Sequence, residues 1–154
     1  MSISVEVDPA YSGLNQTHIQ NIINTVFEKE GYVADNIAVV FGNDELLTDL
    51  KKEFFNKDQL TDVIAFRLND YDEKTVEGEI YISIPRAREN ANSYNEPFAK
   101  EIGRLIIHGS LHLLNFDDET EDDKEVMTMK EDEFLNQCNW QDLLTCIIHE
   151  QSTK

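Results

Sequence analysis

The order of apolar patterns along the chain constrains its fold more than any other feature of the sequence. Four short segments, at residues 3–7, 36–41, 62–66 and 79–84, have the alternation or the apolar runs typical of β-strands. Other segments carry apolar residues at three- and four-residue steps, the pattern of amphipathic helices. The two patterns do not alternate regularly, as they would in a doubly wound protein. The sequence therefore predicts an α+β fold with a small mixed four-stranded sheet.

About five helices are expected to pack with this sheet. The first covers residues 12–30, and the last begins after Thr120, which has a capping-box spacing with Asp123. The other three are expected at residues 43–54, 85–92 and 97–115. The length of 154 residues fits one domain, residues 1–154, in which residues 140–154 form a C-terminal extension of ambiguous pattern.

Acidic residues greatly outnumber basic ones: 31 Asp and Glu against 13 Lys and Arg give a formal net charge of −18. Because phosphate binding rests on Lys and Arg, such a chain does not collect nucleic acid by its overall charge. A local basic patch, a metal ion or a partner must overcome the repulsion. The chain has two cysteines, no apolar run of about 20 residues and no signal-peptide pattern, so we expect a cytoplasmic protein.

Two histidines, His108 and His112, lie four residues apart in the strongest helical pattern of the chain. This spacing puts both imidazoles on one helix face, where they can bind one ion. Asp118 follows six residues after His112, at the offset of the third ligand in extended zinc motifs. The expected helix is thus of the zinc-hydrolase type, HxxxH. A set of three protein ligands with one open position is typical of a catalytic site.

A metalloprotease is excluded by the residue after His108. In the HExxH motif that residue is the glutamate that takes a proton from water, and here it is Gly109. Ser110, between the histidines, has no evident base partner and is not expected to be a nucleophile.

Spacing alone favours a simpler interpretation, a helix with two histidines and no metal. Ten of the seventeen residues in 117–133 are acidic, so a carboxylate would fall near the required offset by composition alone. Most of these acids are explained by the first turn of the last helix, where negative charge is favourable.

Three blocks of sequence favour the metal site by resemblance. Residues 108–118, HGSLHLLNFDD, resemble the signature HGxLHLxG(Y/F)DH of the YbeY family of rRNA maturation factors. Residues 57–66, KDQLTDVIAF, are similar to the family block KDxPTDVLSF, and residues 78–83, GEIYIS, to GDIxIS. The blocks occur in the family's order, and the resemblance covers roughly residues 3–135.

The resemblance implies a function and a set of ligands. The family is regarded as single-strand-specific, metal-dependent endoribonucleases of 16S rRNA maturation and ribosome quality control. Their zinc is held by the histidines of the signature, which match His108, His112 and, with aspartate in place of the last histidine, Asp118. We therefore expect one Zn²⁺ per chain, single-stranded rRNA and small-subunit components as partners, and no DNA or membrane partner.

Two further positions depart from the family pattern. Asn115 replaces a glycine, and asparagine also tolerates the left-handed conformation that a helix end often needs. Phe55 stands where the family typically has an arginine that is considered important for activity. The loss of that arginine bears on catalysis more than on metal binding.

Lys57 and Arg67 bracket the third strand pattern and are candidates for contacts to RNA phosphates. They are equally typical of ordinary loop charges.

Two functions follow from these features. In a hydrolase, water activated by the metal would attack a phosphodiester, with no protein general base assigned. The alternative, favoured by Phe55, is a non-catalytic assembly factor that keeps the metal as structural support and binds protein partners.

Overall fold

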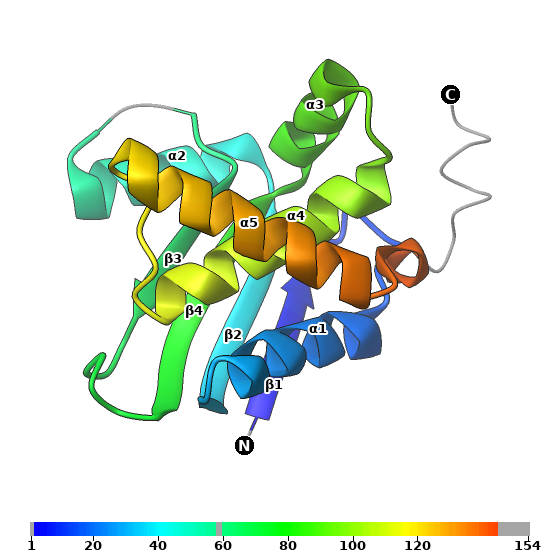
Figure 1. The fold of residues 1–154 in the computed structure, drawn as a ribbon. Helices are drawn as coiled ribbons and strands as arrows, with labels where there is room; N and C mark the ends of the chain where they lie inside the picture. Colours follow the sequence, from blue (N-terminus) through cyan, green and yellow to red (C-terminus); the bar gives the residue numbers. More distant parts are fainter. Residues whose placement is uncertain (1, 58–59, 145–154) are drawn as a thin grey trace.

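The computed structural model describes residues 2–57 and 60–144, and its centre is a four-stranded mixed sheet (Figure 1). Three parallel strands, β1 (Ser2–Val7), β2 (Val33–Gly42) and β4 (Thr75–Ser83), lie side by side. The short strand β3 (Val63–Arg67) pairs antiparallel with β4 at the edge of the sheet. The predicted α+β class and the four predicted strands are confirmed, although β2 and β4 each begin several residues earlier than expected.

Five α-helices and one 3₁₀ turn pack with this sheet. They are α1 (Gln16–Lys29), α2 (Asp44–Phe55), α3 (Ile84–Tyr94), α4 (Phe98–Leu113), α5 (Glu121–Gln137) and η1 (Trp140–Leu143). Helix α1 begins four residues later than predicted, because Gly13 has a φ of 92° and Asn15 caps the helix by accepting from the N–H of His18. None of the helices in the described ranges is long and apolar enough to span a bilayer.

Helix α4 is the central element of the fold. It packs against β3 and β4 on one side, and against α1, α3, α5 and η1 around the rest of its circumference. Figure 1 shows α5 lying across α4 on the side away from the sheet. Most of the apolar side chains of α4, among them Ile102, Ile106 and Leu111, are fully buried. A helix enclosed in this way provides a rigid support for the histidines that it carries.

Two glycines allow α4 to lie close to the sheet. A Cβ atom at Gly109 would be 2.7 Å from Cγ2 of Ile80 on β4, and one at Gly78 would be 2.8 Å from a methyl group of Leu113. Position 109 therefore faces the sheet rather than the histidines' side of the helix. This contact explains why the glutamate of a metalloprotease is absent, since its side chain would not fit between α4 and β4.

The segment between α4 and α5 turns back beside the end of α4. Asn115 adopts a left-handed conformation with a φ of 76°, as expected for a residue in place of glycine, and Phe116 donates its N–H to the carbonyl of Leu111. Thr120 then caps α5 by accepting from the N–H of Asp123, as its spacing predicted. These two local stops keep the intervening residues, including Asp118, close to the last turn of α4.

The contact between Gly109 and Ile80 can be tested by a change of one methyl group. We expect Gly109→Ala to lower the free energy of unfolding by about 1–2 kcal/mol, because overpacking outweighs the better helix propensity of alanine. In an Ile80→Ala background the obstructing methyl group is gone, so the same change should be neutral or stabilising. Urea unfolding of the four proteins measures the coupling. An equal loss in both backgrounds would show that the close approach does not matter.

Candidate metal centre

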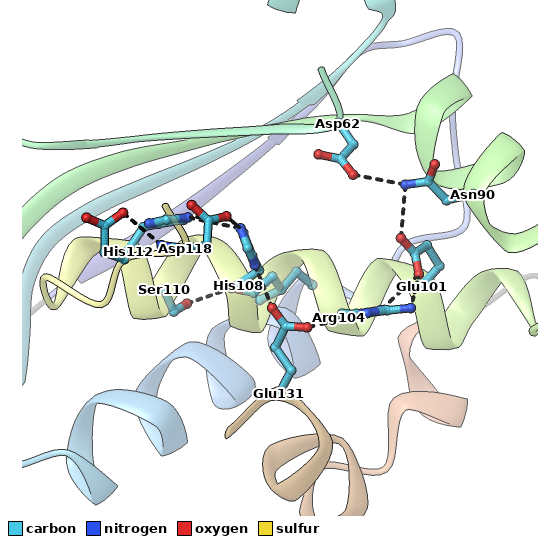
Figure 2. Close-up of polar contacts among 11 residues, drawn as sticks. Asp62, Asn90, Glu101, Arg104, His108, Ser110, His112, Asp118 and Glu131 are labelled. Atoms are coloured by element: carbon cyan, nitrogen blue, oxygen red, sulfur yellow. Dashed lines mark hydrogen bonds and ion pairs between the residues drawn. The ribbon is translucent and has the colours of Figure 1, made fainter. Parts of the chain in front are cut away.

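His108 and His112 project from the same face of α4 toward one point. Their Nε2 atoms are 2.9 Å apart, and each imidazole is partly buried (Figure 2). This convergence follows from their four-residue spacing on a helix whose ends and packing are fixed.

Asp118 reaches the same point from the segment after α4. Its Oδ2 atom lies 3.5 Å from Nε2 of His108 and 3.6 Å from Nε2 of His112. The carboxylate of its neighbour Asp117 is turned back instead and accepts the backbone N–H of Asp118, at 2.7 Å. The structure thus brings together the three side chains that the sequence singled out, and it distinguishes Asp118 from the acids around it.

The three ligand atoms are close to the positions that a single ion requires. Atoms bound at 2.0–2.2 Å to a tetrahedral zinc ion are separated by about 3.3–3.6 Å, and the distances from Asp118 to the two imidazoles, 3.5 and 3.6 Å, match this range. The two Nε2 atoms, 2.9 Å apart, must move slightly away from each other to bind the same ion. Two imidazole nitrogens and one carboxylate oxygen are a donor set that suits zinc and similar divalent metals. His108, His112 and Asp118 could therefore hold a metal with one coordination position left for water or substrate.

Glu131 on α5 fixes the orientation of His108. Nδ1 of His108 lies 2.5 Å from Oε2 of Glu131, whose residue is only 4% exposed (Figure 2). Because a carboxylate can only accept, Nδ1 carries the proton and Nε2 is left for a metal. Glu131 was not predicted as a site residue from the sequence. Its signal was an acid in the apolar stripe of α5, between Met127 and Phe134, where a solvated charge is not expected.

Arg104 on α4 joins Glu131 to a second buried acid. Its guanidinium lies 3.4 Å from Glu131 and donates to Glu101 at 3.0 and 3.1 Å. The amide of Asn90 donates to both Glu101 and Asp62. Burial raises the pKa of Glu101, while Arg104 and Asn90 partly oppose that shift. The resulting network ties α3, α4, α5 and the start of β3 to the histidine site.

The two imidazoles differ in their affinity for a proton. Burial alone would lower the pKa of His108, but the hydrogen bond and charge of Glu131, followed by Asp118 and Asp62, outweigh it and raise that pKa. Burial and the positive charge of His108 lower the pKa of His112, against the opposing effect of Asp118. Of the two, His112 therefore gives up its proton more readily.

Two hollows meet at this site. A cavity of about 350 Å³, here called the inner cavity, lies over the charged network and includes Asn90, Arg104, Met127 and Glu131 in its lining. A wider hollow of about 560 Å³, here called the edge groove, follows the edge strand β3. His108, Asp118 and Asp62 line both hollows, whereas His112 lines only the edge groove.

The structure separates the two candidate phosphate contacts. Lys57 lines the edge groove together with His112. The guanidinium of Arg67 instead donates to the carbonyls of Asp70, Glu73 and Leu113 and to the side chain of Asn69. Arg67 therefore anchors the β3–β4 connection to the end of α4, and a phosphate contact by it stays a prediction.

Ser110 is fully buried and donates its hydroxyl to the carbonyl of Ile106, in keeping with the expectation that it is not a nucleophile. Cys138 is a buried free cysteine, whereas Cys146 and His149 lie outside the described residues.

The model of the family described as endoribonuclease YbeY matches residues 5–139. The chain belongs to this family. A relative from Flavobacterium psychrophilum named endoribonuclease YbeY is 36% identical over 88% of this chain and 94% of its own length. Another of that name, from Christiangramia forsetii, is 40% identical over 74% and 78% of the two chains. The expected class, an RNA-cutting phosphodiester hydrolase, is confirmed at the level of the family.

The fold has a counterpart among solved structures. The solution structure of a Thermotoga maritima protein matches with a TM-score of 0.61 and 27% identity, covering 89% of each chain. The arrangement of sheet and helices that supports the histidine helix therefore recurs outside this chain.

The role of Glu131 can be tested through metal affinity. We expect Glu131→Gln to weaken metal binding about 10- to 100-fold, because the neutral amide no longer favours the Nδ1 proton of His108. Competition with a coloured chelator measures this directly. Glu133→Gln, an exposed change on the same helix, should leave the affinity as in wild type. Equal affinity in all three proteins would exclude Glu131 as a support of the site.

Proposed function

We propose that this chain is a single-strand-specific, metal-dependent endoribonuclease of 16S rRNA maturation and ribosome quality control. The observation that carries the proposal is the convergence of His108, His112 and Asp118 in a protein of the YbeY family. In this proposal the three side chains hold one Zn²⁺. When bound, that ion would lower the pKa of a water molecule and neutralise charge on the phosphoryl oxygens.

The chain's own residues then have distinct tasks. Glu131 holds His108 with Nε2 toward the ion, and Arg104 holds Glu131 in turn. The edge groove admits an RNA strand to the site, and Lys57 meets a phosphate there. We assign no protein general base.

The partners follow from the same proposal: single-stranded rRNA and components of the small ribosomal subunit, in the cytoplasm. Because the net charge is −18, the RNA must be attracted locally, by the ion and by the lysines of the edge groove. A specific observation, Phe55 in place of the family's arginine, favours the alternative of a non-catalytic assembly factor that binds protein partners.

Cleavage of RNA separates the two functions. We expect the zinc-loaded protein to cut a single-stranded RNA and to leave a duplex of the same sequence intact. His112→Ala removes one ligand and should abolish cleavage, as followed on a denaturing gel. A wild-type protein that binds stoichiometric zinc but does not cut would support the assembly factor instead.

The choice of Asp118 as third ligand can be tested against its neighbour. Asp118→Ala leaves two imidazoles and should lose stoichiometric zinc, whereas Asp118→His supplies a neutral ligand and should retain it. Asp117→Ala should retain it as well, because the Asp117 carboxylate accepts a backbone N–H. Elemental analysis of untagged proteins is the measurement. Loss of zinc in Asp117→Ala, with retention in Asp118→Ala, would show that the wrong carboxylate was chosen.

A further inference from the structure

The edge groove brings an exposed aromatic ring and two lysines beside the proposed metal centre. Lys51 and Phe55 come from the last two turns of α2, and Lys57 follows that helix. His112 and Asp118, which also line the groove, come from α4 and from the segment after it. The groove therefore contains a flat apolar surface with positive charges, and beside it a cluster of side chains that could bind a cation.

The ring of Phe55 is held in place although it is exposed. Its residue is 42% exposed, and the ring stacks on Phe66 of β3 with a centroid separation of 5.8 Å and an angle of 16°. Phe66 is fixed in turn by edge-on contacts with Phe54 and Tyr81. A ring that is already ordered can bind a second flat group at little further cost in conformational entropy.

Positive charge lies next to this ring. The ammonium group of Lys51 lies over the Phe55 ring, 4.6 Å from its centroid, and Lys57 is exposed in the same groove. The acids of the groove are Asp62, just before β3, and Asp117 to Glu119, in the segment that follows α4. Lys51 and Lys57 are the groups there that attract a phosphate. An aromatic platform beside backbone-tracking cations is the arrangement that binds single-stranded nucleic acid.

We propose that an unpaired base of the RNA takes the place of the Lys51 ammonium group over the ring of Phe55, and that Lys51 and Lys57 contact the phosphates next to that base. The strand then follows the edge of β3 to the ligands His108, His112 and Asp118. This inference rests on the proposed function, and it gives a structural reason why single-stranded RNA is bound in preference to a duplex. A base within a duplex is already stacked and paired, so it cannot lie against the ring.

Phe54 provides a matched control. It is also exposed, at 58%, and also packs against Phe66, with a centroid separation of 5.2 Å, but it does not line the edge groove. The same substitution at Phe54 and Phe55 therefore removes a similar ring from the same cluster, and it reaches the groove only at Phe55.

The experiment measures binding of a fluorescent single-stranded RNA to the zinc-loaded, full-length protein by stopped flow, before the RNA is cut. We expect Phe55→Leu to weaken binding roughly 5- to 150-fold, the loss of one base–aromatic stack. Phe54→Leu should change it less than twofold, and Phe55→Trp should bind at least as tightly as wild type. Lys51→Gln and Lys57→Gln should each reduce the salt slope by about one.

A scan with single abasic sites identifies the stacked base. One position should weaken binding to wild type, and that penalty should vanish in Phe55→Leu. An unchanged penalty, or equal losses in Phe54→Leu and Phe55→Leu, would overturn the stacking while RNA cleavage by wild type keeps the proposed function. A wild-type protein that neither binds nor cuts single-stranded RNA would overturn both.

Discussion

The contact between α4 and β4 is the constraint on which the site depends. Gly109 lets α4 lie against Ile80. The neighbouring face of the helix, which carries His108 and His112, is then directed along the edge of the sheet rather than into its centre. The edge strand β3 then borders the site, and the hollow around it is open. A bulkier residue at position 109 would lift the helix, and with it both imidazoles, away from the strand that borders them.

Buried charge connects this packing to metal binding. Glu101 and Glu131 share one guanidinium, that of Arg104, so the network holds more negative than positive charge in a place that water hardly reaches. Glu131 accepts from one nitrogen of His108, and a cation would bind at the other. Such a cation compensates part of the excess negative charge through the imidazole. The network thus favours an ion at the site and also joins α5 to α4.

Features set by neighbouring residues were predictable from the sequence, and features set by distant ones were not. Thr120 and Asn43 cap helices through N–H groups three residues away, so both helix starts could be read from spacing. The starts of β2 and β4 depend on each other, because Val33 pairs with Thr75. Likewise the ligands His108, His112 and Asp118 lie within eleven residues, whereas Glu131 meets His108 only when α5 folds across α4. The hydrogen bond from Arg67 to the carbonyl of Leu113, 46 residues away, also depends on tertiary structure.

Phe55 stands where the family resemblance implies an arginine, and a guanidinium offers two properties at once. It combines a flat surface, which stacks on bases, with a charge that binds phosphate. In this chain the same groove contains both properties on separate side chains: the ring of Phe55 supplies the surface, and Lys51, 4.6 Å from its centroid, supplies the charge. A lysine binds phosphate as a point charge without the planar fork, so the strand is held less rigidly than by arginine. In the proposed complex, the position of the RNA along the groove would depend more on the stacked base and on an ion held by His108, His112 and Asp118, so the ring of Phe55 would orient the strand.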